Sequence, residues 1–264
     1  MRIIGAKSLS WRFWAVWQRN WTVYRRTWQM SFLPPFVEPI LYVLAFGLGF
    51  RGLIAGVEYQ GRPVSYVAFI APALLAVTIM YNAFFENTYS SFVRMYYQKT
   101  FDAIMSTPIS LEEVIIGEIV WGATKAVIAA GLMLSVLTCM GLVHYPHGLL
   151  VVPLAFLGGL AFGALGMVFT GIVKHIDMFN LPTFLLITPM FLFSGTFFPV
   201  ESLPSWAQPI ALALPLTHIV SLARSMTLGS FPDHTAWVAL ACLATFTAIG
   251  IPFALLSMRR RLIR

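Results

Sequence analysis

Residues 148–173 read GLLVVPLAFLGGLAFGALGMVFTGIV, an apolar stretch without any Asp, Glu, Lys, Arg or His. A helix needs about 20 mostly apolar residues to cross the roughly 30 Å of membrane hydrocarbon, where its backbone must satisfy its own hydrogen bonds. Five other stretches meet this test, which gives predicted spans at 31–50, 64–85, 114–143, 148–173, 180–200 and 235–258. The sequence therefore predicts an all-α integral membrane protein with six transmembrane helices.

The composition fits this class and excludes others. Hydrophobic residues make up 59% of the chain and charged residues only 10%, whereas soluble proteins carry about 25% charged residues. The net charge is +7, but Lys and Arg cluster at the ends of the apolar stretches, where they meet lipid head groups. The positive charge thus indicates membrane topology, and we expect no nucleic-acid partner.

Basic residues are concentrated at the two ends of the chain. Residues 1–30 carry six basic and no acidic side chains, and the tail 259–264 carries four Arg residues. Because cytoplasmic segments are rich in Lys and Arg, both termini are predicted to be cytoplasmic, and the number of spans must be even. A further uncharged stretch, 203–222, is interrupted by Pro204, Pro209 and Pro215. We expect it to form a broken helical hairpin that re-enters the membrane from the outside.

The amino-terminal arm, residues 1–30, has aromatic residues at helical spacing. Trp14, Trp17, Trp21, Tyr24 and Trp28 recur every three or four residues, and Arg12, Arg19 and Arg26 fall on the opposite side. A helix with these two faces is typical of the membrane interface. The alternative is a helix that packs on the protein's own cytoplasmic surface.

The longest cytoplasmic connection between predicted spans is 92–113. A short amphipathic helix that ends before Pro108 is predicted here, because the residue before a proline disfavours helical geometry. Tyr97, Phe101 and Met105 are spaced by four residues and would share one face of that helix. The helix could contact a soluble partner or pack on its own bundle, and the spacing alone favours neither.

The sequence offers little for catalysis. The fragment Gly122-Ala-Thr-Lys125 lacks the spacing of a nucleotide-binding loop, and the five His residues lack metal-ligand spacing. We therefore expect no metal, cofactor or catalytic residue in this chain. Four ionisable side chains in or beside the spans are expected to face the bundle interior: Glu38, Glu86, Glu118 and Lys125. An ion pair between helices, with Glu86 reaching the third span, is favoured over a transport role.

Residues 191–199 read FLFSGTFFP and are followed by Leu203-Pro-Ser-Trp206 and Leu214-Pro-Leu-Thr-His218. This pattern resembles the signature of the ABC-2 family of transporter permeases, and within it the NodJ-like branch associated with lipo-oligosaccharide export. Weaker matches are Glu38-Pro39, Phe46-Gly-Leu-Gly49, Thr107-Pro108 and Gly117-Glu118. The resemblance covers nearly the whole chain.

The resemblance implies a homodimer in the bacterial inner membrane, served by two copies of a separate ATPase subunit that bind ATP and Mg. It implies a coupling helix within 92–108, whose contact residues would be Tyr97, Phe101, Asp102, Met105, Thr107 and Pro108. It also implies an external hairpin at 203–222, marked by Pro204, Trp206, Pro215 and His218.

The expected function is export of an amphiphile, such as a lipo-oligosaccharide, a glycolipid, a polysaccharide precursor or a hydrophobic drug. A stand-alone secondary transporter or channel is the alternative, but that class more often has paired broken helices, and only one broken segment is visible here. A membrane-embedded enzyme would need a polar catalytic cluster. Aromatic candidates for the substrate pathway, which could equally pack or face lipid, are Tyr42, Phe46, Tyr81, Phe84, Phe191 and Phe197.

Overall fold

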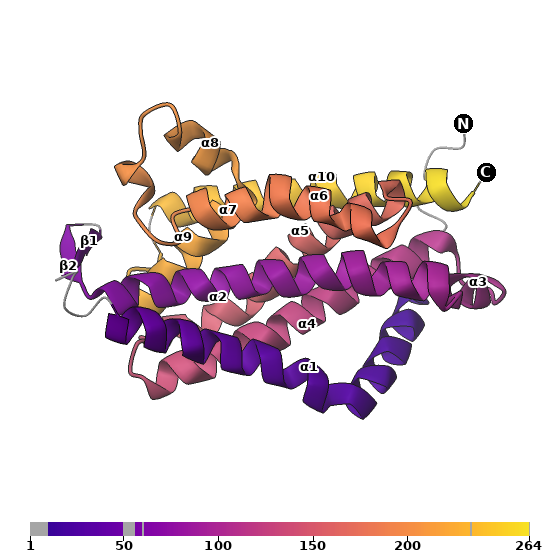
Figure 1. Ribbon diagram of the computed structural model, residues 1–264, viewed down its shortest axis with the longest axis horizontal. Coiled ribbons are helices and arrows are strands. Elements are labelled where there is room, and N and C mark those ends of the chain that lie inside the picture. The colour runs from indigo at the N-terminus through magenta and orange to yellow at the C-terminus, as the bar shows by residue number, and fades with distance from the viewer. Residues whose placement is uncertain (1–9, 50–55, 60, 233, 264) are drawn as a thin grey trace.

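The computed structural model describes residues 10–49, 56–59, 61–232 and 234–263 (Figure 1). Within these residues the protein is helical except for turns and one antiparallel hairpin, in which β1 (Val57–Tyr59) pairs with β2 (Arg62–Val64). The long helices run side by side along one axis. Some side chains in the second half of α1 lie outside the described set, and those of Glu38 and Phe46 are among them.

Helix α1 (Phe13–Gly49) bends at Thr27, where φ is −117° and ψ is 17°. The arm before the bend carries the predicted aromatic face, because the rings of Trp17 and Trp21 stack with centroids 5.7 Å apart. Both rings meet the edge of Trp121 at 6.3 Å, and Tyr24 meets it at 5.6 Å. Trp17, Trp21 and Tyr24 therefore pack on the protein's own bundle, which was the alternative to a face turned to the membrane interface, whereas Trp14 and Trp28 of the same face are exposed.

Helix α2 (Tyr66–Phe85) begins at Ser65, whose hydroxyl accepts a hydrogen bond from the backbone N–H of Ala68 at 3.3 Å. The helix does not stop at residue 85. It continues through two π-helical turns, η1 (Glu86–Ser90) and η2 (Val93–Tyr97). A π turn has a wider hydrogen-bonding ring than an α turn and changes the direction of the side chains that follow.

The other helices follow in chain order. They are α3 (Thr100–Met105), α4 (Leu111–Cys139), η3 (His147–Leu150), α5 (Val151–Ile172), η4 (Ile176–Phe179), α6 (Asn180–Pro182), η5 (Thr183–Ile187), α7 (Thr188–Phe193), η6 (Val200–Ser202), α8 (Gln208–Ala213), α9 (Pro215–Leu228) and α10 (His234–Leu262). Helix α5 lies at the centre of the bundle and packs against α2, α4, α9 and α10.

Small residues bring α5 close to its neighbours. A Cβ atom on Gly159 would lie 2.6 Å from the Cα atom of Ala123 in α4, and one on Gly163 would lie 2.9 Å from Nδ2 of Asn87. Such distances leave no room for a side chain at either glycine. Close helix packing of this kind is typical of a GxxxG pair in membrane helices.

Five helical stretches among the described residues are long and apolar enough to cross a membrane. They are Tyr66–Tyr97, Leu111–Cys139, His147–Ile172, Ile176–Phe193 and Thr235–Leu262. Each overlaps one predicted span, so the prediction of a helical membrane protein is confirmed. The remaining predicted span, 31–50, falls mostly in the second arm of α1, which is helical to Gly49. The stretch 203–222 forms α8 and most of α9, with a break at Leu214 before Pro215.

Candidate functional site

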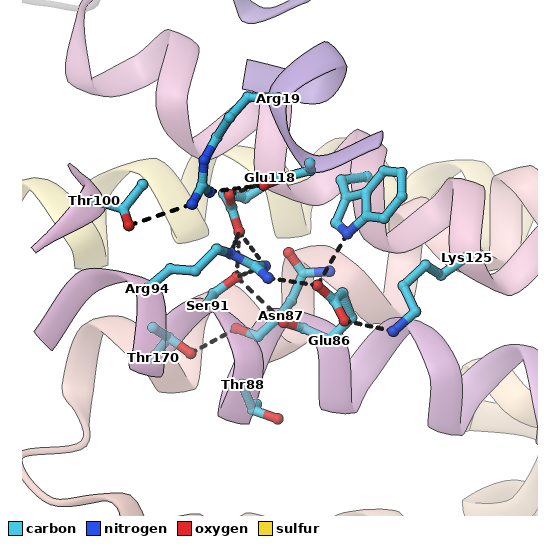
Figure 2. Close-up of polar contacts among 12 residues, drawn as sticks. Arg19, Glu86, Asn87, Thr88, Ser91, Arg94, Thr100, Glu118, Lys125 and Thr170 are labelled. Carbon is cyan, nitrogen blue, oxygen red and sulfur yellow. Dashed lines mark hydrogen bonds and ion pairs between the residues drawn. The ribbon is translucent and has the colours of Figure 1, made fainter. Parts of the chain in front are cut away.

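Four charged side chains meet inside the bundle at the end that carries α3, and we call them the charge network. Glu86 comes from η1, Arg94 from η2, and Glu118 and Lys125 from α4 (Figure 2). Nη1 of Arg94 lies 2.8 Å from Glu86, and Nη2 of Arg94 lies 2.5 Å from Glu118. Nζ of Lys125 contacts the second carboxylate oxygen of Glu86 at 2.8 Å. The network therefore crosses from the extended α2 to α4.

The charge network is buried and internally neutral. The side chains of Glu118 and Glu86 are 0% and 4% exposed, and those of Arg94 and Lys125 are 13% and 23% exposed. Two carboxylates and two basic groups balance one another. Removing one partner of such a buried group is strongly destabilising, because the other charge is left without compensation.

Uncharged donors complete the coordination of both carboxylates. The amide of Asn20, on the first arm of α1, donates to Glu118 at 2.9 Å, and the hydroxyl of Ser91 donates to Glu118 at 2.7 Å. The indole N–H of Trp121 donates to Glu86 at 3.0 Å. The network thus joins three elements that are distant in sequence: the arm of α1, the π-helical end of α2, and α4.

Two further contacts connect this network with neighbouring helices (Figure 2). Arg19, beside Asn20 on the α1 arm, donates to the hydroxyl of Thr100 at the start of α3 at 3.4 Å. The carbonyl of Asn87, in the first π turn, accepts a hydrogen bond from Thr170 of α5 at 2.7 Å. These contacts link α3 to the α1 arm and α5 to the π-helical end of α2.

A pocket of about 370 Å³ adjoins the network between the α1 arm, the end of α2 and α4. Its wall includes Arg19, Tyr24, Tyr89, Gln98 and Lys125. The carboxylates of Glu86 and Glu118 already contact protein groups. The arrangement therefore holds the helices together and leaves neither carboxylate free to bind an ion. The expected ion pair between helices is present, with Glu86 reaching Lys125 of the third span.

The connection after α2 differs from the single helix that the spacing predicted. Lys99 adopts a left-handed conformation with φ of +53° and separates η2 from α3. Tyr97 and Phe101 therefore lie on different elements, and the prediction that Tyr97, Phe101 and Met105 share one helix face is wrong. Phe101 is fully buried against the bundle, whereas Tyr97 is 60% exposed.

The other predicted contact residues lie on the outer side of this turn. Asp102, Thr107 and Pro108 are exposed, and Met105 is half-buried. Arg12, just before α1, donates to the carbonyl of Pro108 at 2.6 Å. A short α3 that ends before Pro108 is present, as predicted, and the surface beside it consists of Tyr97, Asp102, Thr107 and Pro108.

The aromatic candidates for a substrate pathway separate into groups. Tyr81, Phe191 and Phe197 lie together, with ring centroids of Phe191 and Phe197 5.1 Å apart and those of Tyr81 and Phe191 6.2 Å apart. Phe84 is fully buried in the core, and Tyr42 on the second arm of α1 is 39% exposed. Phe46 lies outside the residues whose side chains are described.

The hairpin residues lie at the opposite end of the bundle from α3 (Figure 1). Pro204 and Trp206 precede α8 and are exposed, and Trp206 is 71% exposed. Pro215 begins α9, and His218 on α9 lines a cavity. Arg224 is a buried charged residue at this end and is 4% exposed.

Two central arginines were missed by the sequence analysis. Arg94 falls within the predicted cytoplasmic connection 92–113, and no role was predicted for Arg224. A helix continued past residue 85 would have placed Arg94 two turns beyond Glu86 on the same helix, which is the signal that could have found it. For Arg224 the sequence carries no comparable signal, because its partners are backbone carbonyls and aromatic rings.

The fold and the network describe a helical membrane protein whose buried charges position helices. A family model, ABC-2 type transporter, matches residues 12–228, and the chain belongs to this family. Membrane subunits of this family are components of transport and not themselves catalysts.

Individual relatives extend over the whole length. The chain is 34% identical over 259 residues to Nodulation protein J of Rhizobium leguminosarum bv. viciae, which covers 98% of this chain and 97% of the relative. It is 36% identical over 260 residues to Nodulation protein J of Rhizobium leguminosarum bv. trifolii, with coverage of 97% and 95%. It is 25% identical over 217 residues to the inner membrane transport permease YadH of Escherichia coli K12, with coverage of 81% and 82%.

Proposed function

We propose that this chain is the transmembrane permease subunit of an ATP-driven exporter for an amphiphile that carries a sugar head, such as a lipo-oligosaccharide, a glycolipid or a polysaccharide precursor. The observation that carries the proposal is the nearly full-length similarity to Nodulation protein J. That similarity agrees with the lipo-oligosaccharide branch indicated by residues 191–218. A hydrophobic drug is the other amphiphilic substrate compatible with the family.

The proposed topology has six spans in a bacterial inner membrane. The second arm of α1 supplies the first span, in addition to the five apolar helical stretches. The start of α1 and the end of α10 both lie at the α3 end of the bundle (Figure 1), which supports an even number of spans. Arg259, Arg260 and Arg261 in the last turn of α10 favour the cytoplasmic side for that end.

The opposite end is then external, and α8 and α9 form the re-entrant hairpin. Two short helices joined at a break can lie within the membrane if the protein covers the backbone N–H and C=O groups that lose their helical partners at the break. The hydroxyl of Thr217, two residues after Pro215, donates to the carbonyl of Ala211 in α8 at 2.5 Å. This contact supports a hairpin in which a backbone carbonyl near the break accepts a hydrogen bond from within the protein.

At the cytoplasmic end we propose that the exposed surface beside α3 docks on a partner ATPase. Two such subunits, which bind ATP and Mg, would serve a homodimer of this chain. Tyr97, Asp102 and Thr107 are exposed beside α3 and suit an interface. Phe101 is buried and would hold α3 on the bundle, so of the two predicted aromatic contacts we keep Tyr97 and withdraw Phe101.

The coupling of ATP to transport would run through the charge network. ATP binding brings the two ATPase subunits together, the α3 surfaces move with them, and the dimer changes from inward to outward access. Thr100 contacts Arg19, and Asn20 next to it contacts Glu118. A motion of α3 would reach α4 and the π-helical end of α2 by this route, because the network is bonded at each step.

The test is reconstitution in lipid vesicles with and without the cognate ATPase subunit. The chain alone is expected to hydrolyse no ATP, and the complex is expected to hydrolyse ATP and to move a fluorescent glycolipid between leaflets. Hydrolysis by the isolated chain, or ATP-independent movement at the rate of the complex, would overturn the proposal. The second result would instead favour a stand-alone transporter.

A further inference from the structure

A cavity of about 870 Å³ opens at the end of the bundle opposite α3. Its wall is contributed by the β hairpin, the segment after α7, α8, α9 and the start of α10, which Figure 1 shows gathered at that end. The volume falls within the range of roughly 300–1,000 Å³ that is typical of small-molecule sites. None of the charged residues of the network contributes to it.

Arg224 forms part of the cavity wall and has a fixed orientation. Its Nε donates to the carbonyl of Phe69 at 3.0 Å, and its Nη2 donates to the carbonyl of Gly195 at 2.8 Å. The guanidinium carbon lies 3.7 Å from the centroid of the Phe69 ring. Arg224 is 4% exposed, so two of its three nitrogens are held by the protein and little of it is presented to an anion.

Ser194 supplies an unused hydrogen-bonding group in the same wall. It is fully buried, and its hydroxyl has no hydrogen-bond partner in the part of the chain that the structure describes. A buried hydroxyl without a partner is costly, and such groups are rare in folded proteins. Thr196 is also buried without a partner, but it does not line the cavity. Ser194 is therefore the one of the two that a ligand in the cavity could satisfy, and because it is fully buried its side chain would turn toward the cavity to do so.

The rest of the wall favours an uncharged polar ligand. Glu58 and Glu201 are exposed and offer carboxylate acceptors, while Ser221 and His218 can exchange hydrogen bonds in either direction. Two carboxylates disfavour an anionic group such as a phosphate. Sugar hydroxyls both donate and accept, which suits a wall with acceptors and amphoteric groups.

The wall also has an apolar part, formed by Leu212, Val220 and Val238. Val238 is 62% exposed and lies on α10 beside Trp237, which is 66% exposed. An amphiphile could therefore place its polar head in the cavity and its acyl chain along the apolar surface of α10.

We infer that this cavity binds the carbohydrate head of the exported amphiphile on the external side of the membrane. The inference rests on the proposed function for the direction of transport and for the sugar-bearing substrate. Binding itself requires no ATP, so the two can be tested separately.

The experiment measures protection of a thiol in the cavity wall. The full-length chain carries Cys139→Ser, Cys242→Ala and Ser221→Cys, and is placed in lipid nanodiscs. The rate of modification by a charged methanethiosulfonate is measured with dodecyl maltoside, dodecylphosphocholine or dodecyltrimethylammonium, each below its solubilising concentration. The maltoside is expected to slow modification at least five-fold, and the other two less than two-fold.

Two controls define the site. A thiol at Ser205, exposed before α8 and outside the cavity, should react at the same rate with all three amphiphiles. Ser194→Ala should reduce the protection by the maltoside at least three-fold, whereas Thr196→Val should preserve it. If Ser221→Cys does not fold, the same series is measured with a thiol at Val238.

The outcomes separate the possibilities. Equal protection by all three amphiphiles would mean that the acyl chain occupies the cavity, and protection by the ammonium amphiphile alone would mean that the carboxylates bind cations. Either result, or no protection at all, overturns the inference. Protection by the maltoside in a chain that shows no ATP-driven export would preserve the sugar site and overturn the proposed function alone.

Discussion

The two ends of the bundle each bury an arginine, and they neutralise it in different ways. Arg94, at the α3 end, contacts the carboxylates of Glu86 and Glu118 at 2.8 and 2.5 Å. Arg224, at the opposite end, has no carboxylate within ion-pair distance among the described residues, and is held by the carbonyls of Phe69 and Gly195 and by aromatic rings. The first arrangement neutralises charge with carboxylates, and the second stabilises it with hydrogen bonds and cation–π contacts.

The difference indicates what each end does. Four side chains that neutralise one another are stable only as a set, so the charge network holds the α1 arm, α2 and α4 together. Carbonyl partners tolerate the removal of the cation more readily, because they are not charged. The α3 end therefore holds its helices together through compensated charges, whereas the arginine at the opposite end is bound by uncharged groups.

The largest expected effect is that of Arg94→Met. This change leaves Glu86 and Glu118 buried with one fewer positive charge, and we expect a loss of about 3–5 kcal/mol in the free energy of unfolding. The measurement is denaturant titration of the purified chain in detergent micelles, followed by circular dichroism. Lys125→Met is the matched control, and it should cost clearly less because Arg94 and Trp121 still contact Glu86. Equal losses would show that the network depends on Lys125 as much as on Arg94, and no loss for Arg94→Met would show that it does not depend on Arg94.

The sequence was sufficient to predict the helices but not to predict the charge network. Whether a stretch spans the membrane depends on the length and apolar composition of that stretch. Both can be read from the sequence, so most spans could be predicted. The contact of Glu86 with the third span was anticipated because a charge in a span needs a partner. The position of Arg94 depends on two π turns that extend α2, and no local pattern in the sequence predicts a π turn.

The coupling segment shows the same limit. Spacing by four residues predicts a common face only if one helix contains all the residues, and the left-handed Lys99 ends that helix. The burial of Arg224 could not be predicted for a related reason. A positive charge between predicted spans indicates a loop, and its burial depends on carbonyls of α2 and of the segment after α7 that meet only in the folded protein.

Phe101→Ala is expected to have the next largest effect. The Phe101 side chain is fully buried against the bundle, and truncation of a buried phenylalanine costs about 3–5 kcal/mol. We expect a value near the lower limit, about 3 kcal/mol, because α3 is short and lies at the end of the bundle. Thermal denaturation of the isolated chain should show the loss without any ATPase subunit. An unchanged melting temperature would mean that Phe101 faces the partner after all.

Arg224→Met tests the other half of the comparison. It leaves the carbonyls of Phe69 and Gly195 without their donors, and unsatisfied buried groups cost about 1–3 kcal/mol. The same denaturant titration should therefore place its loss below that of Arg94→Met. A loss as large as that of Arg94→Met would mean that Arg224 neutralises a charge in the folded protein, and the contrast between the two ends would fail.

The smallest change in stability is expected for an exposed aromatic residue at either end. Tyr97 beside α3 is 60% exposed, and Trp206 before α8 is 71% exposed. Surface substitutions away from special features usually change stability by less than about 0.5 kcal/mol. Tyr97→Ala and Trp206→Ala should therefore unfold at nearly the same denaturant concentration as the parent chain, which makes them a matched pair for a functional comparison.

Their effects on the partner should nevertheless differ. Truncation of an aromatic anchor at an interface commonly costs 2 kcal/mol or more, so Tyr97→Ala should weaken retention of the ATPase subunit at least ten-fold or lower glycolipid transport per ATP hydrolysed. Trp206→Ala should leave retention unchanged, because the proposed topology places it on the other side of the membrane. Retention is measured by copurification at several subunit concentrations, and transport per ATP on complexes matched for subunit ratio. If the two variants retain the subunit equally well and with equal coupling, the surface beside α3 is not where the ATPase binds.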